Sequence, residues 1–209
     1  MRRRWVLDCE TTSLAVDYKT GSGVIWELAI LDPDTGEQHM WRMLPKVGLA
    51  DPKALEAGKF YERTRLMRER DRRANDLAGR VLSRAQPWSG PEAVAAVLAP
   101  LLDGATVICA VPTFDKPFVE GFLNAYHQAL TCHFRWRDIG SMAWGYLCGI
   151  GSEIAIPDPD ASTDDFAMAL RVNPDGFTRH SALGDVGLCA AMLAVIEARR
   201  PQVPDEAAA

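Results

Sequence analysis

Two carboxylates near the amino terminus are the first residues whose types and spacing could do chemistry. Asp8 and Glu10 flank Cys9 at the end of a short apolar run, residues 5–7. Because side chains two positions apart lie on the same face of a strand, both carboxylates can meet one site. Divalent cations such as Mg²⁺ and Mn²⁺ favour oxygen ligands of this kind. Acidic pairs also occur at the solvated start of loops, so this pair needs partners elsewhere in the chain before it predicts a metal site.

Two later segments carry residues that could be these partners. Asp115 follows the apolar run 105–110 at a predicted strand-to-helix junction, where an aspartate is also a common helix cap. His180 and Asp185 stand five residues apart at the start of a segment rich in Leu and Ala. A histidine can take a proton from water, and an aspartate one helical turn on can hold a metal beside it. The alternative is a surface histidine and a helix-start aspartate without chemistry.

The elements that must position these residues follow from hydrophobic patterning. Strands are predicted at residues 5–8, 24–31, 37–43, 105–110 and 134–139, and the turn signal at residues 32–36 favours an antiparallel meander of the first three. Helices are predicted at residues 63–84, 91–102, 115–130, 140–149 and 183–199. Three strands followed by alternating helix and strand predict an α/β fold, a mixed sheet with helices packed on its faces.

Length and composition bound the class of protein. The 209 residues, 48% of them hydrophobic, predict one domain over residues 1–200 and a disordered tail at 201–209. The five cysteines are scattered, odd in number and without a CxxC pair, which is typical of reduced thiols in an intracellular protein. No apolar stretch approaches the roughly 18 residues of a membrane span. We therefore expect a cytoplasmic protein without a membrane partner.

The charge distribution leaves two interpretations open. A net charge of -5 argues against binding nucleic acid through overall basicity, although a site that gathers carboxylates around cations adds negative charge of its own. The segment Arg63 to Arg84 is locally basic. It could be an arm that contacts the phosphates of a single strand, or a solvated helix whose arginines pair with the interleaved acidic residues.

An acidic segment at residues 158–164 alternates carboxylates and hydroxyls as a calcium loop does. Thr163 stands where the sharp turn of such a loop needs glycine, and Ala169 stands where the bidentate glutamate should be. We therefore predict an acidic surface loop and no calcium site.

Taken together, the motifs resemble a known family. Leu7-Asp8-Cys9-Glu10-Thr11-Thr12-Ser13-Leu14 is similar to the first motif, D-x-E-T-T-G-L, of the DEDDh (DnaQ-like) exonucleases, with Ser13 in place of glycine. Residues 25–30 resemble the family's second strand, residues 113–115 its second motif, and His180 to Asp185 its H-x4-D motif. The resemblance covers about residues 5–193. It implies a ribonuclease H-like mixed β-sheet, with three antiparallel strands followed by parallel strands, flanked by helices.

The resemblance also implies roles for individual residues. Asp8, Glu10, Asp115 and Asp185 would hold two divalent cations, Mg²⁺ or Mn²⁺, and His180 would be the general base. Thr11, Thr12 and Leu14 would bind the terminal nucleotide through contacts to its sugar and an apolar wedge against its base. The implied partner is a nucleic acid with a free 3′ end, with single-stranded DNA preferred to RNA. A homodimer and a polymerase partner both remain open.

The activity expected from these residues is metal-dependent 3′→5′ hydrolysis of terminal phosphodiester bonds, with release of nucleoside 5′-monophosphates by a two-metal mechanism. An RNA exonuclease of the oligoribonuclease or transfer-RNA trimming kind is the nearest alternative. A non-catalytic nucleic-acid-binding module is another, although clustered acids without a metal would cost stability. An endonucleolytic or strand-transferring enzyme is disfavoured by His180. Proofreading, repair, recycling and viral roles are not separated by the sequence.

Overall fold

A five-stranded mixed sheet forms the centre of the computed structural model, which describes residues 2–17, 23–63, 89–150 and 156–198. The strands are β1 (Arg4–Thr11), β2 (Ile25–Leu31), β3 (Gln38–Arg42), β4 (Thr106–Cys109) and β5 (Arg137–Asp138). Their order is β3-β2-β1-β4-β5. The β1–β2 and β2–β3 pairs are antiparallel, and the β1–β4 and β4–β5 pairs are parallel. The predicted mixed sheet is confirmed, although its last strand is only two residues long.

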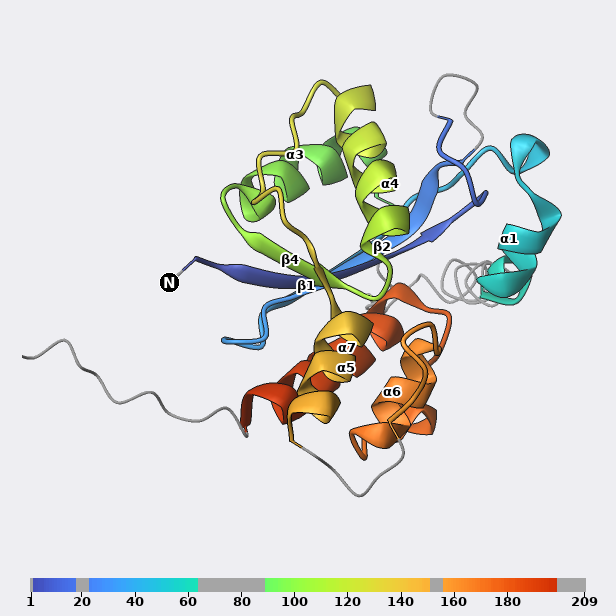
Figure 1. Ribbon diagram of the computed structural model, residues 1–209. Coiled ribbons are helices and arrows are strands. Elements are labelled where there is room, and N and C mark those ends of the chain that lie inside the picture. Colours follow the sequence, from blue (N-terminus) through green and yellow to red (C-terminus); the bar gives the residue numbers. More distant parts are fainter. Residues whose placement is uncertain (1, 18–22, 64–88, 151–155, 199–209) are drawn as a thin grey trace, which may run out of the picture.

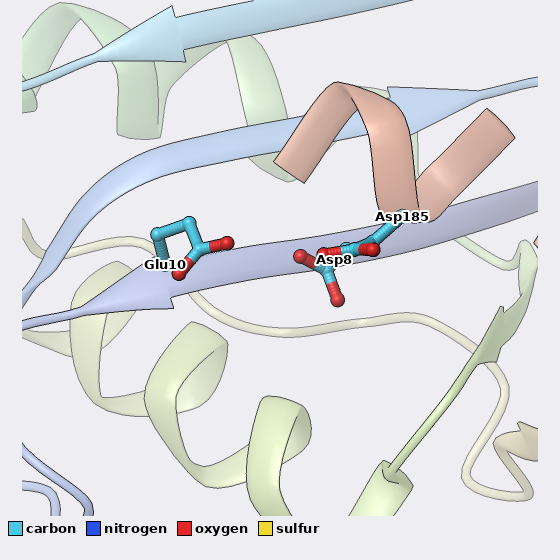
Figure 2. Close-up of side chains that lie close together, drawn as sticks. All are labelled: Asp8, Glu10 and Asp185. Atoms are coloured by element: carbon cyan, nitrogen blue, oxygen red, sulfur yellow. The ribbon is translucent and has the colours of Figure 1, made fainter. Parts of the chain in front are cut away.

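Helices cover both faces of this sheet (Figure 1). The helices α3 (Pro91–Leu102) and α4 (Pro112–Ala125) lie on one face, and α5 (Ile139–Gly149), α6 (Thr163–Ala169) and α7 (Ala182–Ala198) lie on the other. The short helix α1 (Pro52–Ala57) lies beyond the end of the sheet at which β1 finishes. The start of α7 passes over β1 beside Asp8 (Figure 2).

Alternation along β1 divides the hydrophobic core into two layers. Trp5 and Leu7 are fully buried among side chains of α3 and α4, whereas Val6 is buried with Val186 and Met192 of α7. Successive strand residues point to opposite faces, so both layers draw on the same short run. The same alternation sends Asp8 and Glu10 to the α7 side.

Several element boundaries differ from the prediction. The α4 helix, expected at residues 115–130, begins at Pro112 and ends at Ala125. Proline fits the first helical turn because its missing N–H would have no helical partner there, which explains the early start. The predicted helix at residues 63–84 lies outside the described residues except for Arg63.

Two of the described α-helices, α1 and α6, were not predicted. In α1, the side chain of Asp51 accepts a hydrogen bond from the Lys53 backbone at 2.9 Å and caps the first turn. In α6, Ser162 and Asp165 cap each other reciprocally. Thr163 and Asp164 therefore belong to a helix, and the prediction of a surface loop is wrong for this end of the acidic segment.

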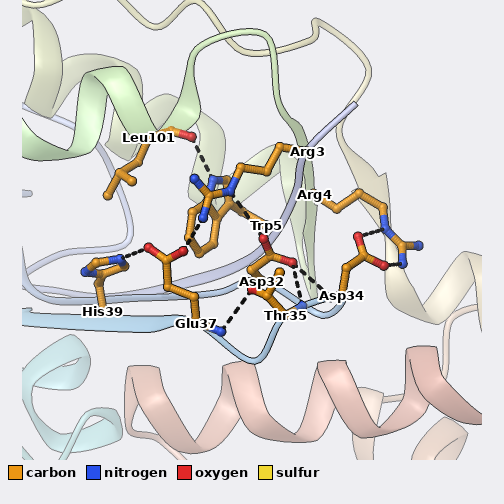
Figure 3. Close-up of polar contacts among 9 residues, drawn as sticks. All are labelled: Arg3, Arg4, Trp5, Asp32, Asp34, Thr35, Glu37, His39 and Leu101. Carbon is orange, nitrogen blue, oxygen red and sulfur yellow. Dashed lines mark hydrogen bonds and ion pairs between the residues drawn. The ribbon is translucent and has the colours of Figure 1, made fainter. Parts of the chain in front are cut away.

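Ion pairs connect the beginning of β1 to the turn between β2 and β3 (Figure 3). Arg3 donates to Asp32 at 3.2 Å and also pairs with Glu37. Arg4 pairs with Asp34 in the turn between β2 and β3, and with Glu197 near the end of α7. These arginines therefore stabilise the amino-terminal end of the strand. Among the helices that the structure describes, none has the length and apolar character to cross a membrane.

Candidate metal centre

Three of the predicted metal ligands meet at one place. Asp8, Glu10 and Asp185 each offer a carboxylate oxygen, and these three oxygens lie within 4.8 Å of one another (Figure 2). Asp8 and Glu10 come from β1, and Asp185 comes from the first turns of α7. All three side chains are partly buried. The cluster has the oxygen ligands and the partial access that a hard divalent cation requires.

The turn before α7 places Asp185. The Ser181 hydroxyl donates to the Thr178 carbonyl at 2.7 Å and accepts from the Gly184 backbone at 3.1 Å, while the Asp185 N–H donates to the Ser181 carbonyl at 2.9 Å. A Cβ on Gly184 would lie only 2.0 Å from the Thr178 carbonyl oxygen. The glycine therefore permits the close packing that brings Asp185 over β1.

Burial is the largest influence on the pKa values of two carboxylates in the cluster, Asp8 and Glu10. Burial, together with the charges of Asp115 and Glu10, raises the pKa of Asp8 well above its ordinary value. Burial raises the pKa of Glu10 from 4.5 to about 7, and the nearby charge of Arg63 opposes that rise. Both shifts mean that the carboxylate form is disfavoured in this environment. A bound divalent cation would reverse this effect, so the residues present fit a metal.

Arg179 is a residue of this site that the sequence motifs did not identify. Its guanidinium pairs with Asp185 and, at 2.8 Å, with Asp164 of α6. The guanidinium contacts Oδ1 of Asp185, so Arg179 places positive charge on this carboxylate and competes with a cation for that oxygen. The only sequence signal for Arg179 was its position directly before His180.

Asp115 is close to the cluster but is not part of it. Its side chain is only 2% exposed and accepts a hydrogen bond from the Cys9 thiol at 3.3 Å. Burial raises the pKa of Asp115 to about 6, against the effect of the Cys9 hydrogen bond. Asp115 lies in the first turn of α4, as a helix-start aspartate would, although the N-cap of this helix is Val111. The ligand role of Asp115 stays a prediction.

His180 lies in the turn before α7 and outside the group of three carboxylates. The residue is exposed, and its backbone adopts the left-handed conformation with φ of 59°. Its carbonyl oxygen accepts a hydrogen bond from Arg63 at 3.0 Å. These contacts concern the backbone, and the role of the imidazole as general base stays a prediction.

The predicted nucleotide-binding residues follow the end of β1. Thr11 and Thr12 are buried, and their hydroxyls bond within the loop, Thr11 to the Ser13 carbonyl at 2.7 Å and Thr12 to the Val24 N–H at 3.0 Å. Leu14 is 68% exposed. The threonines therefore hold the loop that carries the exposed leucine. Contact of these three residues with a nucleotide stays a prediction.

Glu27 is a further acidic residue that was missed. It faces Glu10 directly across the β1–β2 ladder and is completely buried. Its carboxylate pairs with Arg42 at 2.5 Å and with Arg63. The sequence signal that could have identified Glu27 was a single carboxylate within the apolar run 24–31. A charge buried in a sheet needs partners, so this position indicated an ion pair.

Comparison with known proteins identifies the fold. No family model matches the sequence, and no curated protein matches it either. Among solved structures, a 3′-exonuclease that recognises the 3′ end of the histone mRNA stem-loop is similar over 93% of this chain and 80% of its own, with 12% identity and a TM-score of 0.55. The nuclease domain of 3′hExo, a DEDDh family member bound to rAMP, is similar over 93% of this chain and 90% of its own, with 12% identity and a TM-score of 0.52. The chain therefore has the ribonuclease H-like fold of a DEDDh exonuclease domain.

Proposed function

We propose that the protein is a metal-dependent 3′→5′ exonuclease that hydrolyses the terminal phosphodiester bond of single-stranded DNA and releases nucleoside 5′-monophosphates. The observation that carries this proposal is the meeting of Asp8, Glu10 and Asp185 within 4.8 Å, at the carboxyl end of β1. These carboxylates come from distant parts of the chain, and the raised pKa values of Asp8 and Glu10 fit a site that binds cations.

In this proposal, the carboxylates bind the metal ions and His180 transfers the proton. Asp8, Glu10 and Asp185 hold divalent cations, with Asp115 contributing from the other side of β1. Bound cations supply Lewis-acid chemistry for an in-line displacement at phosphorus. His180 accepts the proton from the attacking water, whose oxygen forms the new bond to phosphorus as the bond to the 3′-oxygen breaks. Its exposed position gives water access to the residue.

The loop after β1 supplies the proposed contact with the substrate end. Hydrogen bonds to the Ser13 carbonyl and from the Val24 N–H hold Thr11 and Thr12 in place, so these two residues can present a defined surface to the terminal sugar. The exposed side chain of Leu14 packs against the terminal base. Apolar contact with a base face is indifferent to base identity, so digestion proceeds without sequence preference.

RNA is the second candidate substrate. Of the two similar structures, one recognises an mRNA stem-loop and the other is bound to rAMP. Discrimination between sugars would rest on contacts to the 2′-hydroxyl. A purely binding role is less compatible with the carboxylate cluster, because gathering partly buried acids without a metal costs stability.

The direct test is digestion of 5′-labelled single-stranded DNA and RNA of equal sequence, with Mg²⁺, with Mn²⁺ and with chelator. We expect metal-dependent shortening from the 3′ end, and a loss of about 100-fold or more in kcat for Asp8→Asn and Asp185→Asn, because charge stabilisation worth several kcal/mol is removed. His180→Ala should lose about 100-fold or more in kcat while its Mn²⁺ affinity is kept.

Asp175 is exposed and is not one of the three clustered carboxylates. Asp175→Asn therefore makes the same chemical change outside the cluster and is a matched control. This variant should digest DNA at the parent rate. The proposal is overturned if neither nucleic acid is shortened with any metal, or if Asp8→Asn is as active as Asp175→Asn.

A further inference from the structure

Within the described residues, the buried Glu27 carboxylate has three partners, which lie on three different parts of the fold. One oxygen, Oε2, accepts from Arg42 of β3 at 2.5 Å. The other, Oε1, accepts from the Ala182 N–H at 2.9 Å and pairs with Arg63. Ala182 is the first residue of α7. Glu27 therefore joins the middle of the sheet to the start of the helix that carries Asp185.

Arg63 extends this connection to the turn before α7. Its Nη2 bonds to Glu27, while its Nη1 donates to the His180 carbonyl at 3.0 Å and to the Gly58 carbonyl at 3.3 Å. Its guanidinium also lies over the Trp26 ring, 4.7 Å from the ring centroid. The side chain is only 14% exposed. Arg63 is therefore held within the fold, and its contacts are those of a structural link.

His180 adopts a backbone conformation that needs such support. A φ of 59° places it in the left-handed region, which is unfavourable for residues other than glycine. Arg63 bonds to the carbonyl of His180, and Glu27 accepts from the N–H two residues later. The direction of a side chain follows from its backbone, so these two bonds fix where the imidazole can point.

We propose that Glu27 and Arg63 are positioning residues, which orient the His180 imidazole by holding the peptide groups on its carboxyl side. The proposal rests on the proposed function, because His180 is the general base there. Neither residue contacts the substrate. Their effect is on turnover, since a proton acceptor displaced by about 1 Å can lose on the order of 100-fold in rate.

The two arginines on Glu27 provide a matched pair of variants. Arg63→Lys keeps a cation beside Glu27 but loses the forked geometry that reaches the His180 carbonyl. Arg42→Lys makes the same change on an arginine of β3, which pairs with the other oxygen of Glu27. We expect kcat to fall about 10- to 100-fold in Arg63→Lys and less than about threefold in Arg42→Lys, with Mn²⁺ affinity kept in both.

A second readout does not depend on activity. The chain has four histidines, so the His180 ring resonance can be assigned in carbon–proton NMR spectra by comparison with His180→Ala. We expect this resonance to shift in Arg63→Lys and to stay in place in Arg42→Lys. A double variant completes the test: in a His180→Ala background, Arg63→Lys should lower kcat no further, because both changes remove the same contribution.

The outcomes separate the two proposals. If the parent protein shortens DNA or RNA, but Arg63→Lys leaves kcat and the His180 resonance unchanged, the positioning role is overturned and the nuclease stands. An equal loss in Arg42→Lys and Arg63→Lys also overturns it, because the effect would then come from Glu27 packing alone. If the parent protein shortens no nucleic acid, the proposed function fails. A shifted His180 resonance confined to Arg63→Lys would then still support the structural link.

Discussion

Individual residues set the space around the metal cluster as well as its charge. Gly58, at the end of α1, lies against Glu10, and a Cβ on this glycine would be 2.8 Å from Glu10 Oε2 and 3.2 Å from the Trp26 ring. Its φ is -75°, which any residue can adopt. The need for glycine here is therefore steric, and it arises from a contact between distant parts of the chain.

A methyl group at this position should disturb metal binding. We expect Gly58→Ala to displace the Glu10 carboxylate and to weaken Mn²⁺ binding about tenfold, measured by calorimetry, because a ligand moved by tenths of an ångström no longer fits the cation. Gly48→Ala is the control, since nothing lies within 4 Å of a Cβ there. Equal Mn²⁺ affinity in the two variants would contradict the steric role of Gly58.

For individual residues, the sequence predicted which residue types form the site better than it predicted the contacts that surround each side chain. The spacing of Asp8 and Glu10 placed both on one face, and the structure brings Asp185 to them. The hydrogen bond between Asp115 and Cys9 could not be predicted, because it depends on how α4 packs against β1. Glu27 and Arg63 were missed for the same reason, since their partners lie far away in sequence.

Among the elements, the turn before α7 is the one on which the site depends most. It carries Arg179 and His180, and it packs so closely on the helix that Gly184 has no room for a side chain. Moving this turn would displace the proposed base and one metal ligand together.

We expect Gly184→Ala to lower the free energy of unfolding by about 2–3 kcal/mol, measured by chemical denaturation, because the new methyl group meets backbone that cannot rotate away. Activity should fall in the same variant as the turn shifts. Gly145→Ala, in α5, is the control: its Cβ meets nothing within 4 Å, so better helix propensity should stabilise it by up to about 1 kcal/mol. A Gly184→Ala variant as stable as the parent would contradict this packing.

Element prediction succeeded where the pattern was long and failed where it was short. The amphipathic run of α3 was predicted with its observed bounds, Pro91–Leu102. The helices α1 and α6 have six and seven residues, too few to be stable alone, so they form through capping and tertiary contacts. Their capping residues, Asp51 and Ser162, were visible in the sequence but did not predict helices without a longer apolar pattern.

For the molecule as a whole, the carboxylate cluster links stability to pH. The Glu10 carboxyl titrates near 4.5 in the unfolded chain and near 7 in the fold. Between these values the folded state binds more protons than the unfolded state, so stability falls as pH rises. Asp115, whose pKa rises to about 6, acts in the same direction.

We expect the metal-free protein to be less stable at pH 7.5 than at pH 5, with Glu10 accounting for on the order of 2 kcal/mol after allowance for its partial exposure. Denaturation in the presence of chelator measures this difference. In Glu10→Gln the difference should shrink, because this group no longer titrates. At pH 7.5, Mn²⁺ at about 100 times its dissociation constant should restore about 2.7 kcal/mol to the parent. A metal-free parent that gains stability towards pH 7.5 would contradict the linkage.

The sequence by itself determined the kinds of residue and the order of elements: a mixed sheet, the Asp8 and Glu10 pair on one strand face, and His180 and Asp185 at the start of the last helix. These follow from local periodicity, which acts over a few neighbouring residues. Only the tertiary structure decided which groups share a site. Burial and electrostatic contact depend on residues far apart in the chain, and for that reason the Glu27–Arg63 link, the Cys9 bond to Asp115 and the space beside Gly58 had to be found in the fold.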